Sequence, residues 1–211
     1  MITLPRKLPM KPAALGFRAH SGWAVLIAVS GDRHLPDVIA RRRLDLVDSN
    51  APGARQPYHA AAEMDFARAE KFIARSIERT SEIAREALLP AIDGLRGKDY
   101  QPVTCGILLA SGRPLPDLKS TLASHPLIHT AEGELFRNAL MRASEASGLQ
   151  VTRFKEREVF DRAAAALHLS STEITRRLGE LGRAMGPPWR LDEKLATVAA
   201  WIALASLKAT G

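Results

Sequence analysis

The chain has 211 residues, 46% of them hydrophobic, a length and composition that suit one domain with a sizeable core. Its 30 Lys and Arg residues outnumber 23 Asp and Glu, and the net charge of +7 suits a DNA or RNA partner, although proteins that bind neither also carry such a surplus. One cysteine excludes an internal disulfide, and no run approaches the roughly 18 to 20 apolar residues that cross a membrane, so we expect a cytoplasmic protein in a reducing compartment.

The first residues are rich in proline. Pro5, Pro9 and Pro12 interrupt the segment 1–13, which carries positive charge but no continuous apolar stretch, and this excludes an ordinary signal peptide. We therefore expect a proline-rich arm over residues 1–13 and a single domain over residues 14–211.

Three strand candidates come next, joined by short turns. They cover residues 14–19, 23–29 and 36–47, and glycine and aspartate between them supply turn chemistry. Consecutive strands with such short connections predict an antiparallel meander. The third candidate contains Arg41, Arg42 and Arg43, whose charge suits either an edge strand that resists aggregation or a contact with phosphate.

Hydrophobic periodicity and turn residues indicate the remaining elements. A long amphipathic helix is expected over 60–89, which Pro90 and the glycines after it loosen or end. The apolar run 101–110, which includes Cys105, predicts a buried central strand. Beyond it we expect a helix over 130–147, a strand over 149–154, and helices over 160–169, 173–185 and 192–207.

The order of these elements predicts a mixed sheet covered by helices, with a parallel, right-handed strand-helix-strand unit in its second half. The segments 16–24, 106–111, 148–159 and 192–204, in this order, resemble the opening strands, central strand, next strand and last helix of the ribonuclease H-like superfamily, in its Holliday-junction-resolvase (RuvC-like) branch. The resemblance implies an α/β three-layer fold: an antiparallel three-strand meander followed by parallel strands, with flanking helices.

The resemblance also implies nuclease chemistry, in which carboxylates hold two divalent metals. The family pattern places acids in the first strand, at the end of the central strand and at the start of the last helix. In this chain the first position falls on Arg18, which cannot ligate a cation, and the second falls near Ala110 or Ser111. Only Asp192 and Glu193 match the pattern. We therefore expect a domain that binds nucleic acid or a protein partner without conventional two-metal catalysis.

A metal-dependent phosphodiesterase with an atypical site is the alternative. His20 follows Arg18 on the same strand face, and His129 and Glu132 are spaced i, i+3; with Asp192 they make a mixed nitrogen and oxygen ligand set for Mg, Mn or Zn. The catalytic candidates are then Asp192, Glu193 and Glu134. Capping explains the same residues, with Thr130 as the N-cap and the acids in the first turn. His59, at a helix start, favours a structural role, and His125, in an expected loop, has no assigned role.

A phosphate-binding surface needs no metal. The arginines Arg18, Arg41, Arg42 and Arg43 lie in strand candidates, and Arg176 and Arg177 lie in a late helix. If several share one face, they would bind a phosphate backbone in a salt-dependent manner. The segment 163–185 has the outline of a helix-turn-helix, but two ordinary helices that complete the crossover explain it as well. The sequence leaves the oligomeric state open.

Overall fold

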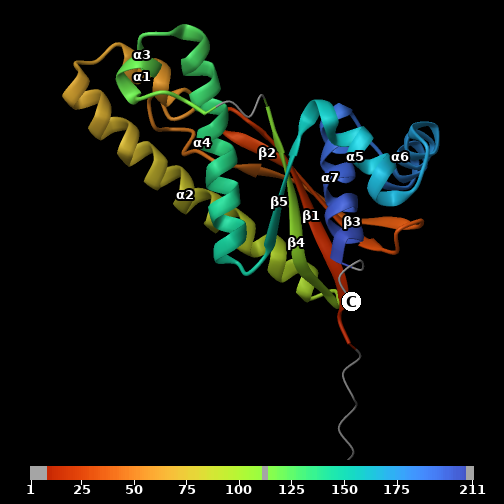
Figure 1. The fold of residues 1–211 in the computed structure, drawn as a ribbon. Helices are drawn as coiled ribbons and strands as arrows, with labels where there is room; N and C mark the ends of the chain where they lie inside the picture. The colour runs from red at the N-terminus through yellow and green to blue at the C-terminus, as the bar shows by residue number, and fades with distance from the viewer. Residues whose placement is uncertain (1–8, 111–113, 208–211) are drawn as a thin grey trace, which may run out of the picture.

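The computed structural model describes residues 9–110 and 114–207. Its core is a five-stranded sheet in the order β3-β2-β1-β4-β5 (Figure 1). The first three strands form an antiparallel meander, β4 pairs with β1 in parallel, and β5 pairs with β4 in parallel. This confirms the expected mixed sheet and places the arginine-rich third strand at an edge. The strands are β1 Lys11–His20, β2 Trp23–Gly31, β3 Pro36–Asp45, β4 Tyr100–Leu109 and β5 Gln150–Lys155.

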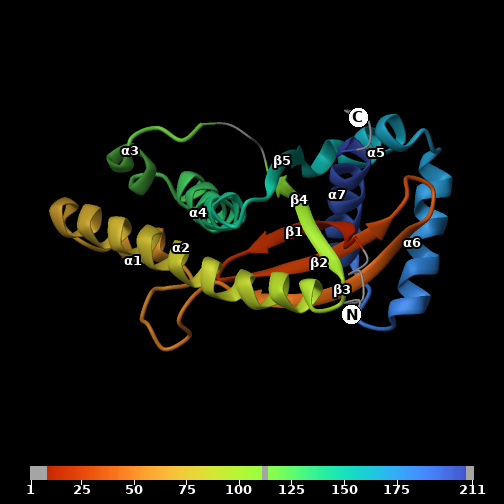
Figure 2. The same cartoon turned by 90° about the horizontal axis from the view of Figure 1, so that it is seen from below.

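Helices cover both faces of the sheet, as expected for three layers. Figure 1 and Figure 2 show α2 and α4 on one face and α5, α6 and α7 on the other, while the first half of α2 projects beyond the sheet together with α1 and α3. The helices are α1 Pro57–Ala62, α2 Phe66–Arg96, α3 Leu118–Leu122, α4 His125–Ala146, α5 Val159–Leu167, α6 Ser171–Met185 and α7 Leu191–Leu207, with a 3-10 turn at Glu156–Glu158.

The expected helix over 60–89 is two helices. The chain breaks between α1 and α2 because Asp65 adopts an extended conformation and its carboxylate accepts a hydrogen bond from the backbone N–H of Arg68, which starts α2. Pro90 does not end α2, which continues to Arg96. The turn after Pro90 buries Ile92 and Leu95 in the main core, and this packing outweighs the local cost of the proline.

Two other expected boundaries are wrong. Helix α4 starts at His125 rather than at Thr130, because Pro126 suits a first helical turn; Thr130 lies inside the helix and its hydroxyl donates to the carbonyl of Pro126 at 3.0 Å. Strand β1 starts at Lys11, inside the segment expected as an arm, where the backbone N–H of Lys11 donates to the carbonyl of Asp99. Residues 1–8 lie outside the described residues.

Helix α7 packs directly on the centre of the sheet. Gly16 of β1 and Gly106 of β4 leave space for its backbone: a Cβ at Gly16 would lie 1.8 Å from the carbonyl oxygen of Ala196, and one at Gly106 would lie 2.4 Å from that of Ala199. Nearly all of α7 between Leu195 and Ala205 is buried. Within the described ranges, no helix is long and apolar enough to cross a membrane.

Cys105 offers a direct test of the core. Its side chain is fully buried in β4, and burial raises the pKa of the thiol to about 11. At pH 8, well below that pKa, the group is a protonated, inaccessible thiol, so we expect the native protein to resist a thiol-reactive dye and the urea-unfolded protein to react promptly. Rapid labelling of the native protein would contradict this burial.

Candidate functional site

The guanidinium of Arg18 lies between two carboxylates. Its Nη2 and Nε donate to Glu156 Oε1 and Oε2 at 3.0 and 3.2 Å, and its Nη1 donates to Asp192 Oδ1. The exposed fraction is 20% for the Arg18 side chain, 24% for Asp192 and 39% for Glu156. Burial alone would lower the pKa of Arg18, but hydrogen bonds and charge from Glu156 and Asp192 outweigh it and raise that pKa. We call these three residues the Arg18 cluster.

Strand geometry brings the Arg18 cluster together. Strands β1, β4 and β5 run parallel, so their carboxyl ends meet at one edge of the sheet, where ligands bind in open α/β folds. Arg18 lies near that end of β1, and Glu156 directly follows β5. Arg18 also pairs with Val25, which packs towards α7, so both side chains share the face that carries Asp192 in the first turn of α7.

His20 and Trp23 extend the cluster along the turn between β1 and β2. The His20 ring contacts Asp192 Oδ2 through Nε2 at 3.0 Å and stacks on Trp23 with ring centroids 4.2 Å apart. The Arg43 guanidinium lies over the Trp23 ring, 4.1 Å from its centroid, and pairs with Asp45 at 3.1 Å. Of the predicted residues, the structure therefore brings together Arg18, His20 and Asp192.

The Arg18 cluster does not fit the two divalent metals that the fold resemblance implies. Such ions need carboxylates that face no other cation, whereas Glu156 and Asp192 both face the guanidinium. Glu193 is 7% exposed, and its carboxylate accepts a hydrogen bond from the backbone N–H of Arg190 at 2.7 Å, as a helix cap does. Ala110 follows β4, while Ser111 lies outside the described residues.

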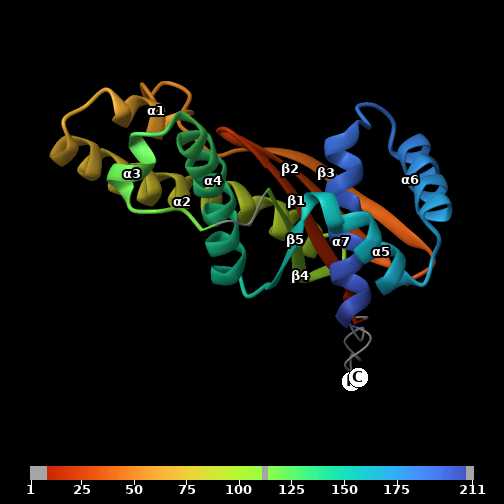
Figure 3. The same cartoon turned by 45° about the horizontal axis from the view of Figure 1, so that its top comes forward.

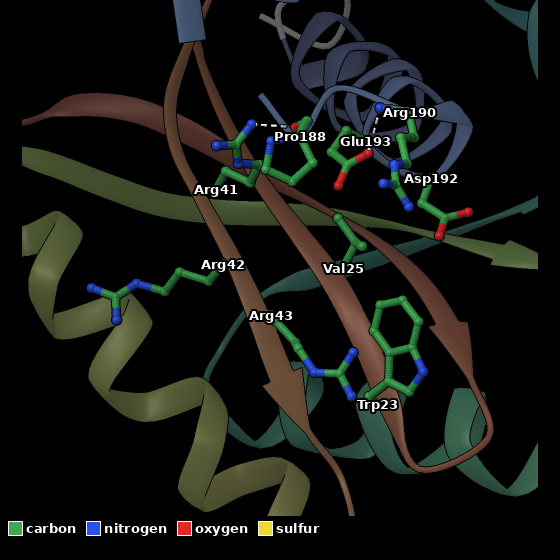
Figure 4. A pocket seen from close by; sticks show the side chains of 9 residues that line it. All are labelled: Trp23, Val25, Arg41, Arg42, Arg43, Pro188, Arg190, Asp192 and Glu193. Carbon is green, nitrogen blue, oxygen red and sulfur yellow. Dashed lines mark hydrogen bonds between the residues drawn. The ribbon is translucent and has the colours of Figure 1, made fainter. Parts of the chain in front are cut away.

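The three consecutive arginines of β3 have separate roles (Figure 4). Arg41 Nη1 and Nη2 donate to the carbonyls of Gly186 and Pro187 at 2.8 and 2.9 Å, and Nη1 also donates to Pro188, so this guanidinium holds the loop before α7. Arg42 points to the opposite face, towards α2. Arg43 and Arg190 line a pocket of about 300 Å³. The three arginines do not form one phosphate-binding row.

The late helices pack as part of the domain. Ile174 and Leu178 of α6 are buried in the core formed with α5 and α7. Arg176 pairs with Glu173 and Glu180 of its own helix, which partly neutralises it. Arg177 is half-buried, and its Nε has no hydrogen-bond partner among the residues that the structure describes. This packing favours ordinary crossover helices over a free recognition helix.

A second pocket, of about 240 Å³, lies at the same sheet edge on the α4 side. Arg137 of α4 and Arg153 of β5 line it together with Asn138. Within ranges 9–110 and 114–207, neither guanidinium makes a hydrogen bond or ion pair; Arg137 is half-buried and Arg153 is exposed. Burial lowers the pKa of Arg137, while the negative charges of Glu134 and Glu156 act in the opposite direction. Because Glu156 belongs to the Arg18 cluster, Arg137 lies near that cluster.

Sequence reasoning did not single out Glu156 or Arg137. The signal for Glu156 was available, because a charged residue directly after a strand predicted to run parallel to the first lies at the functional edge. Arg137 gave no comparable signal, since one arginine on an amphipathic helix is typical of a solvated face.

The other predicted metal ligands lie in a separate cluster. His129 contacts His59 and His125, with ring centroids 4.7 and 4.5 Å apart, and Glu132 contacts His59. Across the described part of the chain, only these three histidines bring three ligand atoms within 4.8 Å of one another. His20 and Asp192 therefore share no coordination sphere with His129 and Glu132 in this structure. Glu134 lines the second pocket beside Arg137.

Comparison with known proteins supports the fold. No protein-family model and no curated protein matches the sequence. Among solved structures, the chain is similar to RuvC of Thermus thermophilus, with a TM-score of 0.55 and 10% identity over 94% of this chain and 96% of that one. It is also similar to T. thermophilus RuvC in complex with Holliday junction substrate, with a TM-score of 0.56 and 11% identity over 95% and 96%. The chain has the RuvC-like form of the ribonuclease H-like fold.

Proposed function

We propose that this chain is a ribonuclease H-like domain that binds the phosphate backbone of nucleic acid and does not cleave it by the two-metal mechanism. The observation that carries the proposal is the Arg18 cluster. The fold resemblance implies metal ions at this edge of the sheet. Here the Arg18 guanidinium takes that place: it pairs with the carboxylates of Glu156 and Asp192 and neutralises their charge.

The second pocket supplies a site for phosphate. Arg137 and Arg153 face it, and among the described residues neither guanidinium forms a hydrogen bond or ion pair, although Glu134 also lines the pocket; the Asn138 amide adds a neutral donor. Guanidinium groups match phosphate through paired N–H donors, and a half-buried guanidinium without an acceptor gains from such a ligand. The pocket lies at the carboxyl ends of β4 and β5, at the same sheet edge as the Arg18 cluster.

The surface favours a polyanion over an apolar protein partner. Among the described residues, the large exposed hydrophobic side chains are few and are not neighbours along any one element: Leu35 precedes β3, Phe66 and Leu89 lie far apart in α2, and Leu191 starts α7. Protein interfaces of high affinity centre on clustered apolar and aromatic anchors. The net charge of +7 adds long-range attraction for nucleic acid.

Binding to labelled DNA and RNA tests the proposal. A four-way junction, a duplex and a single strand are titrated by fluorescence anisotropy over a range of salt concentrations; the junction is included because the similar T. thermophilus RuvC is described with a Holliday junction substrate. We expect salt-dependent binding, and the double variant Arg137→Gln/Arg153→Gln should bind about tenfold more weakly, with a salt slope smaller by about 1 to 2.

Arg85→Gln is the matched control, because Arg85 is exposed on α2 and touches neither pocket. It should bind as the wild type does. The same substrates are incubated with magnesium or manganese to test for cleavage. Cleavage that Asp192→Asn abolishes would overturn the non-cleaving part of the proposal, and an absence of salt-dependent binding to every probe would overturn the nucleic-acid part.

A further inference from the structure

Three histidines come together where α1 meets the start of α4. These two helices lie at the projecting end of the molecule (Figure 3). His59 belongs to α1, while His125 and His129 lie one turn apart at the start of α4. One ligand atom from each lies within 4.8 Å of the others, and the rings meet edge to face with centroids 4.5 to 5.3 Å apart. We propose that His59, His125 and His129 bind a zinc-class transition metal ion, independently of the proposed function.

Glu132 prepares His59 for this role. Its carboxylate is 2% exposed and accepts hydrogen bonds from the backbone N–H of His59 at 3.2 Å and from its Nδ1 at 2.8 Å. Because a carboxylate only accepts, Nδ1 carries the proton and Nε2 keeps its lone pair for a metal. A carboxylate that holds a ligating histidine in this way is the usual outer partner of a metal site.

Charge and exposure fit the same ion. Glu132 adds a negative charge beside the three histidines, because its carboxylate contacts His59 Nδ1 at 2.8 Å. A divalent cation offsets that charge. His125 and His129 are exposed, so solvent can supply the ion and a fourth ligand.

The ligand set selects the metal class. Three imidazole nitrogens favour zinc, cobalt, nickel or copper over magnesium, which prefers oxygen ligands in octahedral geometry. The site would tie α1 to the first turn of α4. Metal binding would therefore stabilise the projecting end, because the ion binds the folded arrangement and not the unfolded chain.

Metal titration of the full chain, freed of metal with a chelator, tests this proposal. Zinc affinity and stoichiometry are measured by competition with a chromogenic chelator, and cobalt is used to record the ligand-field spectrum. We expect one ion per chain, an intense tetrahedral cobalt spectrum and a higher melting temperature with zinc. His125→Ala and His129→Ala should each lose about a hundredfold or more in affinity, and Glu132→Gln about 10- to 100-fold.

His34→Ala is the matched control, because His34 is exposed and outside the cluster. It should bind zinc as the wild type does. His125 and His129 are exposed, so their replacement should leave the circular dichroism spectrum unchanged. Zinc affinity that is equal in the wild type and in both histidine variants, or no saturable binding at one ion per chain, would overturn the proposal.

Discussion

Replacing Gly16 with alanine is expected to destabilise the protein by about 3 kcal/mol or more, the upper range for overpacked cores. The new Cβ would lie 1.8 Å from the carbonyl oxygen of Ala196 and 2.9 Å from the backbone nitrogen of Ala200. Both atoms belong to the backbone of α7, so no side-chain rotation relieves the clash. The whole helix must move away from β1, and its buried residues lose contact with the sheet.

Gly179→Ala is the matched control. Gly179 lies inside α6, and the nearest atom to its new Cβ is the end of the flexible Arg183 side chain at 3.8 Å. Alanine favours a helix interior over glycine, so this variant should be more stable by about 0.5 to 1 kcal/mol. Urea unfolding measures both midpoints and slopes. A wild-type midpoint for Gly16→Ala would mean that α7 does not approach β1 as the structure shows.

Much of the fold could be predicted from the sequence because local patterns mark most of its elements. Alternation, apolar runs and turn residues located all five strands and the main helices. Gly16 and Gly106 lie where strands β1 and β4 meet α7. Local patterns misplaced elements where a single side chain decides the boundary. The break before α2 depends on Asp65, and the start of α4 depends on Pro126; both carry recognised helix-start signals that the apolar periodicity obscured.

The candidate site was less accessible to sequence reasoning. The fold resemblance placed Arg18 and Asp192 at positions where the family carries acids, but Glu156, which contacts Arg18, lies 138 residues away from it along the chain. Its contact exists only because β5 runs parallel to β1 and ends at the same edge. The histidine cluster was hidden for a different reason: with His125 in an expected loop, its helical spacing of four residues from His129 was absent from the prediction.

Removing the positive charge of Arg18 should make the stability of the protein depend on magnesium. In Arg18→Met, Glu156 and Asp192 lose their shared partner and face each other's charge, which in a fully buried site costs about 3 to 5 kcal/mol. Because these side chains are 20% to 39% exposed, solvent reduces the expected loss to about 2 kcal/mol. Urea unfolding without divalent ions should show this loss.

Magnesium should then restore part of the stability of Arg18→Met and leave the wild type unchanged, because Arg18 already occupies the position between the carboxylates. At a concentration tenfold above its dissociation constant, a bound ion returns about 1.4 kcal/mol. Magnesium is chosen because it selects oxygen ligands and avoids the histidine cluster. Arg18→Lys, which keeps the charge but loses the paired hydrogen bonds, should lose less stability and show no magnesium response. If magnesium stabilised the wild type and Arg18→Met equally, Arg18 would not occupy the position of a metal ion between Glu156 and Asp192.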